Sequence, residues 1–447
     1  MLKVVIVGAN HAGLATARYL LESGKPLEIT LIDKNDSSLG YIAGATPLLI
    51  GKKIPSYKSF FSADIETIAK QVTHFYTNSE VIKIDFGCKR IFARENKGRR
   101  FNFKYDKLVL ATGSSQQDLL VENSELNGIY KMKSLKEALL INQKLSTRNC
   151  RNVAVIGGGY IGVEMAEAFQ LRNKNVRLFE IKDHVLNTHY DKEFAQLAQR
   201  KLSENGIELQ VGEEIVRFEG RNGKLTGIIT RQASYPVDMA ILAIGFLPNT
   251  QLGRNYLTCF TNGAYVVNSA QQTSDPDVYA VGDCATSYSK TLKDQMVDFS
   301  VANALRGSYA AAKSIVDEKV ISDGTVMTNA VKIYGLNFFA TGLTTEKAHK
   351  YGIEIEYVDH EDWVLLPAML NNNKAKIRLI YTKMDRRLVG AQVCSKADLS
   401  GNVSALTLAV QKEMTIDELS FSKFFFYPYF NLPNDLLIKA AQASESR

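Results

Sequence analysis

The chain has 447 residues, of which 45% are hydrophobic and 23% charged, so it is long enough for two or three globular domains with their own cores. The formal charge of +7 is spread without a block of five like charges, which favours a solvated surface over nucleic-acid binding and leaves anionic small molecules open. No apolar run approaches the ~20 residues that cross a bilayer, which argues against integral membrane association and leaves peripheral attachment open.

The beginning of the sequence and its cysteines favour a cytoplasmic protein. Met1 runs directly into an apolar, strand-like segment without the leader of a signal peptide, so secretion is not expected. The cysteines are scattered, with no CxxC pair and no zinc spacing, and the six histidines form no metal cluster. We therefore expect no metal site and five reduced thiols, at Cys88, Cys150, Cys259, Cys284 and Cys394.

The first predicted unit is VVIVGANHAGLATARYLLESGKPLEITLIDKND, residues 4–36, typical of a strand, a glycine turn, an amphipathic helix and a second strand. Gly8 permits the tight turn, Gly13 lets helix and strand approach, and the first N–H groups of the helix face a pyrophosphate. Asp33 is placed to accept hydrogen bonds from a ribose. Asn10 replaces the middle glycine of GxGxxG, which weakens this unit if it is taken alone.

The loop after this unit contains LGYIAGATPLL, residues 39–49, and by position it should face whatever the nucleotide carries. Its central residues, Ile42, Ala43 and Gly44, have no group that can do chemistry. The place closest to the expected cofactor is therefore an apolar one.

A second unit repeats the pattern in VAVIGGGYIGVEMAEAFQLRNKNVRLFEIKD, residues 153–183. It has all three glycines, Gly157, Gly159 and Gly162, and it is followed by Glu180. Two such units in one chain indicate two bound dinucleotides.

Glu180 also predicts which nicotinamide cofactor the second unit binds. A carboxylate ~4 Å from the extra phosphate of NADPH would repel it by a few kcal/mol at an effective dielectric near 20, whereas it can bond a free ribose hydroxyl. NADH is therefore favoured, although Lys182 lies close enough to soften the repulsion. Glu164 has two open interpretations, a carboxylate favoured by the helix dipole or a residue of the nicotinamide site.

Three further strands end in small residues that permit close approach to a ligand. They lie in YDKLVLATGS, residues 105–114, in VDMAILAIGFLPNT, residues 237–250, and in TSDPDVYAVGDCA, residues 273–285. The third of them presents the carboxylate of Asp283 toward the ligand crevice.

The C-terminal part predicts strands in 329–342 and 353–360, a hairpin in 375–395 and an amphipathic helix in 400–414, which together make a sheet with helices on one side. The aromatic run from Phe424 to Tyr429 is most simply the core of a subunit interface.

Together these motifs resemble the FAD-dependent pyridine nucleotide-disulfide oxidoreductases over the whole chain. GANHAG, GGGYIGVE, AIGFLPNT and FFFYPYFNLPND are most similar to the branch of NADH oxidases, NADH peroxidases and coenzyme A-disulfide reductases. The resemblance implies an α/β fold with two Rossmann-like, glutathione reductase-like domains and a C-terminal α+β dimerisation domain of a homodimer. The expected boundaries are 1–114 with 248–322 for FAD, 115–247 for NADH and 323–447 for dimerisation.

The same resemblance implies two sets of binding residues. FAD would be held by Gly8, Asn10, His11, Ala12, Gly13, Asp33, Lys34, Val81, Ala111, Thr112, Gly113, Asp283, Val301 and Ala302. NADH would be held by Gly157, Gly159, Tyr160, Ile161, Gly162, Glu180 and Gly245. The corresponding loop of a partner subunit approaches the flavin in this branch, so Phe426 and Tyr427 are candidates to wall the active site.

The chain differs from the branch at one position of the loop. Relatives carry a cysteine against the flavin there, and this chain has Ala43. The thiol cycles through a sulfenic acid or exchanges with a disulfide, and alanine does neither. Disulfide reduction and thiol-based peroxide reduction are therefore not expected. His11 is expected near the flavin, with its catalytic role open in the absence of the thiol, and Glu164 is the other candidate acid or base.

The leading hypothesis is an enzyme that passes hydride from NADH to FAD and then directly to an acceptor, most simply oxygen, giving hydrogen peroxide. A second hypothesis sends the electrons to a quinone or an electron-carrier protein. The third is a non-catalytic, FAD-binding dimer that responds to redox state. The sequence leaves open the physiological acceptor and whether a coenzyme A-type ligand still binds.

Overall fold

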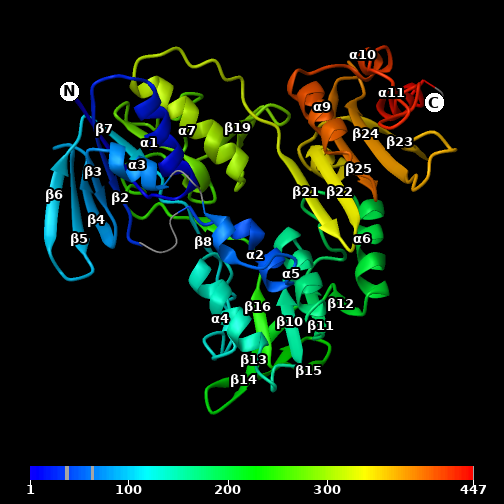
Figure 1. The fold of residues 1–447 in the computed structure, drawn as a ribbon, viewed down its shortest axis with the longest axis horizontal. Coiled ribbons are helices and arrows are strands. Elements are labelled where there is room, and N and C mark those ends of the chain that lie inside the picture. The colour runs from blue at the N-terminus through cyan, green and yellow to red at the C-terminus, as the bar shows by residue number, and fades with distance from the viewer. Residues whose placement is uncertain (36–39, 62–64, 446–447) are drawn as a thin grey trace.

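The computed structural model describes residues 1–35, 40–61 and 65–445. Figure 1 shows three lobes, with β1, α1 and α7 in the first, β10, β11 and α5 in the second, and β21 to β25 in the third. No helix in these described ranges is long and apolar enough to cross a membrane. Within the same ranges, no group of three His, Cys, Asp or Glu side chains is arranged to hold a metal ion.

The first lobe is built on a parallel sheet with the order β18-β7-β1-β2-β3. Its central strands are continuous apolar runs because both faces are covered, by α1 and α7 on one side and by the antiparallel β4-β5-β6 layer on the other. The strands are β1 (Leu2–Val7), β2 (Leu27–Ile32), β3 (His74–Tyr76), β4 (Ser79–Asp85), β5 (Arg90–Glu95), β6 (Arg100–Lys104), β7 (Lys107–Leu110) and β18 (Val278–Ala280).

The helices of this lobe include one that returns from far along the chain. They are α1 (His11–Glu22), α3 (Ile65–Gln71) and α7 (Val301–Ile315), with 3-10 turns at Ala43–Ala45, Tyr57–Phe60 and Gly282–Cys284. The short α2 (Thr46–Ile50) leaves this lobe and packs against α5 of the second (Figure 1). Since β18 and α7 follow the second lobe in sequence, the first lobe is discontinuous. The short hairpin of β19 (Ser287–Ser289) and β20 (Asp294–Met296) precedes α7.

The second lobe repeats the parallel order as β12-β11-β10-β16-β9, with α5 crossing from β10 to β11. An antiparallel layer, β13-β14-β15, covers one face. The elements are β9 (Ile129–Tyr130), α4 (Leu135–Leu145), β10 (Asn152–Ile156), α5 (Tyr160–Gln170), β11 (Asn175–Glu180), α6 (Lys192–Glu204), β12 (Ile207–Val211), β13 (Ile215–Arg221), β14 (Lys224–Thr230), β15 (Ser234–Pro236) and β16 (Met239–Leu242).

The chain enters and leaves the second lobe along two neighbouring strands. These are β8 (Ser114–Gln116) and β17 (Phe246–Pro248), which pair antiparallel. Beside them the Thr112 hydroxyl donates to the Asn249 carbonyl at 2.6 Å, and the Asn249 side chain donates back to the Thr112 carbonyl at 3.0 Å. The two lobes are thus held together at the paired strands by which the chain enters and leaves the second lobe.

The third lobe is an antiparallel sheet of order β21-β22-β25-β24-β23, with α9, α10 and α11 on one face as the sequence predicted, whereas α8 packs separately against Ile380 and Val389. The elements are β21 (Thr328–Ile333), β22 (Leu336–Gly342), α8 (Thr345–Lys350), β23 (Ile355–Trp363), β24 (Lys374–Thr382), β25 (Leu388–Ser395), α9 (Ser400–Gln411), α10 (Ile416–Ser420) and α11 (Leu436–Gln442). Its other face is not left to solvent, because Val331, Ile333 and Phe338 join the core of the second lobe.

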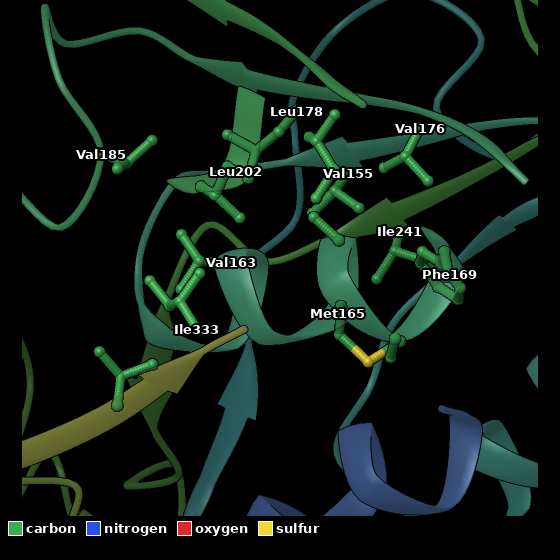
Figure 2. Packing of buried hydrophobic residues seen from close by; sticks show 14 of the residues in the cluster. Val155, Val163, Met165, Phe169, Val176, Leu178, Val185, Leu202, Ile241 and Ile333 are labelled. Carbon is green, nitrogen blue, oxygen red and sulfur yellow. The ribbon is translucent and has the colours of Figure 1, made fainter. Parts of the chain in front are cut away.

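Figure 2 shows that shared core, in which Val163 and Met165 of α5 pack near Val155 and Ile241 of the sheet. Ile333 reaches the same cluster from the third lobe. The helix that follows the second glycine turn is therefore wedged between its own sheet and the third lobe.

Candidate active site

The first glycine turn leaves no room for side chains at two of its positions. Gly8 has φ +106°, and a Cβ built there would stand 2.2 Å from the Ala111 carbonyl oxygen. A Cβ on Gly13 would stand 1.8 Å from the Gly8 carbonyl oxygen. The start of α1 is thereby held against β1, with Ala12 buried, and the N–H groups of its first turn after His11 have no intrahelical acceptor and can bind an anion.

Asp33 holds this turn in shape. Its carboxylate accepts the Ala9 N–H at 2.6 Å and the Asn35 N–H at 2.8 Å, while Lys34 between them is exposed. Asn10 has extended backbone and caps α1 by accepting the His11 N–H at 3.0 Å. The middle position of the pattern therefore does not require glycine, so its replacement does not disrupt the turn.

The neighbouring strand ends line the same edge of the sheet. Ala111 donates its N–H to Val7, and Gly113 follows with φ +68° and open space where a Cβ would be. A Cβ on Gly282 would meet the Ala12 side chain at 2.9 Å, so the turn before Asp283 also lies against α1. Val81 is buried in β4, within the core beneath this edge.

Asp283 is bound to two side chains that the sequence analysis did not single out. The Ser114 hydroxyl donates to its carboxylate at 2.5 Å and the Lys133 ammonium at 3.1 Å. Lys133 comes from the second lobe and lies over the Phe246 ring at 4.5 Å. Burial lowers the pKa of Lys133, although the charge of Asp283 acts to raise it. A partly buried cation thus joins the two lobes at the expected flavin acid.

His11 lies beside the loop that contains Ala43. Its Nε2 is 3.2 Å from the Tyr41 carbonyl oxygen, which only accepts, so Nε2 carries the proton and Nδ1 is an acceptor in the neutral ring. Burial lowers the pKa of His11, while the bond to Tyr41 and the charge of Asp283 act to raise it. The structure therefore brings His11, Asp283 and the loop together.

The loop itself is apolar, as predicted. Ala43 is half-buried, whereas Ile42 and Gly44 are exposed, and Tyr41 below them is buried with its hydroxyl 2.6 Å from that of Thr46. Residues 36–39, the first part of the loop, lie outside the described residues. The small cluster around Ala43 also includes Phe60, Phe61 and Leu135, and it contains none of the five cysteines.

The five thiols lie elsewhere. Cys284 is fully buried under the sheet and donates toward the Leu110 and Val281 carbonyls, and burial raises its pKa. Cys150 and Cys394 are buried in the core shared by the second and third lobes, and burial raises the pKa of Cys394 to about 12. Cys88 is exposed and Cys259 is partly buried in the core of the first lobe. None of these five side chains belongs to the hydrophobic cluster around Ala43.

The start of α7 provides a second set of backbone donors. Ser300 caps the helix by accepting the Asn303 N–H, and Val301 and Ala302 are exposed in its first turn. N–H groups of a first turn have no intrahelical acceptor, so they are available to a ligand. The Ser308 hydroxyl on the same helix donates to the Ala12 carbonyl at 2.8 Å, which packs α7 against α1.

The second glycine turn has nearly the same geometry as the first. Gly157 has φ +105°, and a Cβ on Gly162 would stand 1.8 Å from the Gly157 carbonyl oxygen. Glu180 is buried and accepts the Gly158 N–H at 2.6 Å and the Lys182 N–H at 2.9 Å. This carboxylate therefore holds its turn as Asp33 holds the first.

Other predicted residues of this unit surround the start of α5. Gly159 and Gly245 have open space where a Cβ would be, and Ile161 is half-buried. Tyr160 begins the helix, and its ring stacks on that of His189 at 4.8 Å. His189 is another residue that no motif indicated.

Glu164 lies on α5, one turn before Glu167, whose carboxylate binds residues of the other two lobes. Burial raises the pKa of Glu164 to about 7, with a further rise from Glu167 and an opposing effect of Lys53. Glu167 binds the Lys53 ammonium at 2.5 Å and accepts the Tyr334 N–H at 3.1 Å. The helix dipole would lower the pKa of Glu164, because it favours the charged carboxylate. The pKa is raised instead, so burial has the larger effect.

Comparisons with known proteins agree with this geometry. Residues 2–304 match the family described as pyridine nucleotide-disulphide oxidoreductase, and residues 329–434 match its dimerisation domain. An NADH oxidase of Lactococcus lactis subsp. cremoris is 39% identical over 98% of this chain and 99% of its own length. An NADH oxidase of Streptococcus pyogenes is 36% identical over 99% of both.

Among solved structures, the water-forming NADH oxidase from Lactobacillus brevis bound to NADH superposes with a TM-score of 0.96 at 27% identity. The superposition covers 100% of this chain and 98% of that one. The fold class predicted from the sequence is confirmed, and the chain belongs to the pyridine nucleotide-disulphide oxidoreductase family.

Proposed function

We propose that this protein is an FAD-dependent NADH oxidoreductase that uses oxygen as acceptor and releases hydrogen peroxide. The single observation that carries the product is the apolar loop at Ala43, which lies beside His11 and contains no thiol. The relatives named NADH oxidase support the reductive half of the reaction.

The first lobe fits FAD. The cradle at Gly8 and Gly13 would be filled by a Cβ, and outward N–H groups of α1 would meet the pyrophosphate. We assign the ribityl chain to Asp283 and the pyrimidine edge of the flavin to the first turn of α7, at Val301 and Ala302. When bound, FAD would supply the hydride-accepting and oxygen-reactive group that this chain's side chains lack.

The second lobe fits NADH through the equivalent cradle at Gly157 and Gly162. Glu180 would bond the ribose and disfavour the extra phosphate of NADPH, because a second anion beside a buried carboxylate is repelled. Tyr160 and Ile161 would border the nicotinamide at the start of α5.

His11 would move or hold a proton during reoxidation. Its neutral ring keeps the proton on Nε2 through the Tyr41 carbonyl, which leaves Nδ1 to accept a proton or a hydrogen bond. Burial keeps the ring neutral, since it lowers the pKa of His11. Ala43 beside it would wall the site and exclude water without reacting.

The assembly and boundaries complete the proposal. We assign 1–114 and 248–322 to an FAD-binding domain, 115–247 to an NADH-binding domain and 323–447 to dimerisation, supported by the paired strands β8 and β17. A homodimer is supported by the dimerisation-domain match and by exposed aromatic rings at Phe421, Phe425, Phe426, Tyr427, Tyr429 and Phe430. Five unpaired cysteines suit a reducing compartment such as the cytoplasm.

Anaerobic titration with NADH tests the absence of a second redox centre. Full bleaching of the flavin should take about one NADH per FAD, because flavin and thiol together would take up about two. Aerobic turnover should yield close to one peroxide per NADH. Uptake of two equivalents, or water as the product, would show that a thiol does reach the flavin.

A further inference from the structure

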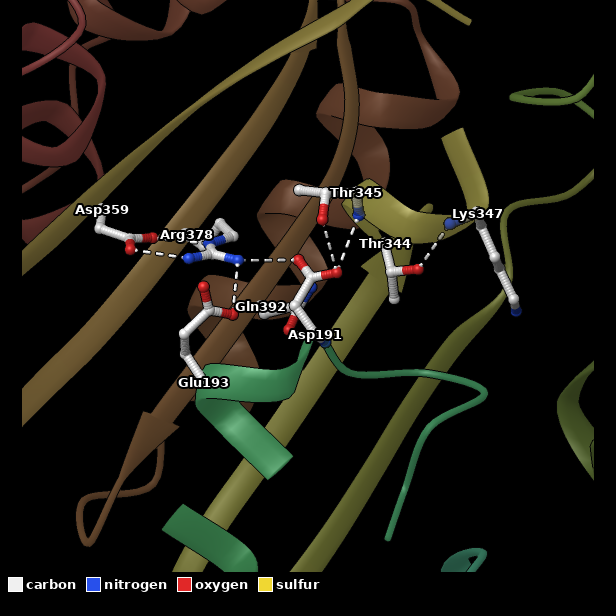
Figure 3. Close-up of polar contacts among 8 residues, drawn as sticks. All are labelled: Asp191, Glu193, Thr344, Thr345, Lys347, Asp359, Arg378 and Gln392. Atoms are coloured by element: carbon white, nitrogen blue, oxygen red, sulfur yellow. Dashed lines mark hydrogen bonds and ion pairs between the residues drawn. The ribbon is translucent and has the colours of Figure 1, made fainter. Parts of the chain in front are cut away.

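The second and third lobes are joined by a buried polar network centred on Asp191, the residue before α6. Figure 3 shows Asp191 between Arg378 and Thr345, both of the third lobe. Its carboxylate accepts from Thr345 N–H at 3.0 Å and hydroxyl at 2.8 Å, from Gln392 Nε2 at 2.7 Å and from Arg378 Nη1 at 3.1 Å. Its own N–H donates to Gln392 Oε1 at 2.9 Å.

Arg378 adds a buried positive charge to this network. Its side chain is only 2% exposed, and it binds Asp359 through Nε at 2.7 Å and Nη2 at 2.8 Å. Burial acts to lower the pKa of Arg378, but hydrogen bonds to Asp359, Glu193 and Asp191 raise it above its ordinary value. A buried cation that loses one carboxylate is costly, so Asp191 is fixed in place.

Asp191 ends the segment from 181 to 191, which also binds the second glycine turn. Leu186 donates its N–H to the Gly158 carbonyl at 2.7 Å, and Gly158 in turn donates to Glu180 at 2.6 Å. The segment is therefore attached at one end to the dinucleotide turn and at the other to the third lobe.

His189 lies within this segment and is held by the third lobe as well. Asn329 of β21 donates from Nδ2 to His189 Nδ1 at 3.1 Å, which requires an unprotonated Nδ1. Burial lowers the pKa of His189 to about 3, and the charge of Lys347 acts in the same direction. The ring is therefore neutral and fixed in orientation.

The orientation of Tyr160 depends on this ring. Tyr160 stacks on His189 with 4.8 Å between centroids and 26° between planes, and it meets the edge of Tyr190 at 6.2 Å. The hydroxyls of Tyr160 and Tyr190 are buried, and neither forms a hydrogen bond of good geometry in the described part of the chain. The stacking on His189 and the edge contact with Tyr190 therefore hold the ring of Tyr160 in place.

We propose that Asp191 and His189 are positioning residues for NADH, through which the third lobe fixes the ring of Tyr160 beside the nicotinamide site. This inference rests on the proposed function, since Tyr160 borders the nicotinamide only if the second lobe binds NADH. Neither residue touches the reacting atoms; each acts through the segment from 181 to 191.

The test compares two carboxylates that contact the same nitrogen of Arg378. Asp191 and Glu193 both lie 3.1 Å from Arg378 Nη1, but their side chains are 4% and 49% exposed. In the FAD-loaded dimer, Asp191→Asn should raise the Kd for NAD⁺ by calorimetry and the KM for NADH about tenfold, with FAD content unchanged, whereas Glu193→Gln should change either by less than about twofold.

A second pair of variants keeps the test independent of folding defects. His189→Ala should raise the same Kd and KM about tenfold, and His189→Phe, which keeps a ring to stack on Tyr160, should recover most of the loss. If Asp191→Asn and His189→Ala lower the melting temperature but leave NAD⁺ binding and KM unchanged, the residues are merely structural and the inference is overturned. If NADH does not bleach the flavin of the unmodified protein, the proposed function itself is wrong, and the inference that rests on it is wrong with it.

Discussion

The two glycine turns are built alike but are held by different surroundings. Both turns start with a glycine near φ +105° and end with a glycine, Gly13 or Gly162, whose Cβ would stand 1.8 Å from a carbonyl oxygen. His11 and Tyr160 occupy the same position, as the first residue of α1 and α5. His11 is bonded within its own lobe to Tyr41, whereas Tyr160 stacks on His189, which the third lobe holds.

This difference separates what binds a dinucleotide from what directs its chemistry. The turn and its acid, Asp33 or Glu180, make an equivalent cradle in both lobes. The residue that opens the helix, and the element that fixes it, differ between the lobes, which fits our proposal that one site holds a flavin beside a loop and the other a nicotinamide. Substitutions in the glycine turn or its acid should therefore cause a large loss of cofactor binding in one lobe only. Substitutions of the residues around the turn should cause smaller losses.

The largest effect is expected from closing one cradle at a time. Gly162→Ala places a methyl group against the Gly157 carbonyl, so NADH should reduce the flavin at least about a hundredfold less efficiently while the protein stays yellow. Gly13→Ala makes the same clash in the first lobe and should remove FAD itself. Flavin absorbance and stopped-flow bleaching measure both.

Gly159→Ala is the control for this pair, since a Cβ there meets nothing within 4 Å. It should retain FAD and lose far less of the NADH rate than Gly162→Ala. Loss of FAD in Gly162→Ala, with retention in Gly13→Ala, would reverse our assignment of the two lobes.

Asp283→Ala should be the next largest change, and it acts on the first lobe alone. The carboxylate is expected to bond the ribityl hydroxyls, and its removal also takes away the acceptor of Ser114 and the anionic partner of Lys133. Most of the FAD should be lost on gel filtration, whereas Asp283→Asn should retain more of it. Unchanged flavin content in Asp283→Ala would refute the assignment of this residue.

Much of this comparison could be predicted from the sequence, because it depends on residues within one strand-turn-helix unit. Gly8, Gly13, Asp33 and their counterparts have a fixed spacing, so their geometry follows from the motif. The apolar loop at Ala43 was predicted in the same way, by its distance from the first unit.

The contacts between lobes could not be predicted. Lys133 reaches Asp283, and Arg378 reaches Asp191, across separations of 150 and 187 residues. Lys133 is one of several lysines in its segment, and no periodicity or spacing distinguishes it before the lobes are placed. Arg378 lies in a segment whose sequence is typical of a strand in the core of a sheet. Tertiary packing alone brings such pairs together.

Cofactor choice should show a smaller effect, confined to the second lobe. The unmodified protein should favour NADH over NADPH in kcat/KM, and Glu180→Gln should narrow that ratio about tenfold by removing the charge while keeping an acceptor for Gly158. Glu180→Ala also loosens the turn, so it should weaken both cofactors. Equal efficiencies for NADH and NADPH in the unmodified protein would contradict the role of Glu180.

The smallest effect concerns Glu164, whose counterpart in α1 is Ala15. Burial raises its pKa from 4.5 to about 7, so the folded protein keeps a proton that the unfolded chain releases. Unfolding therefore becomes easier as pH rises from about 4.5 to about 7, and the penalty is complete above that range. Glu164→Gln removes this penalty and should stabilise the protein at pH 8 by about 3 kcal/mol relative to the unmodified chain, with little difference at pH 4. Glu167→Gln should have the opposite sign at pH 8, because it breaks the ion pair with Lys53. Denaturant unfolding of the three proteins at both pH values checks this, and a Glu164→Gln gain of equal size at pH 4 would mean that the proton plays no part.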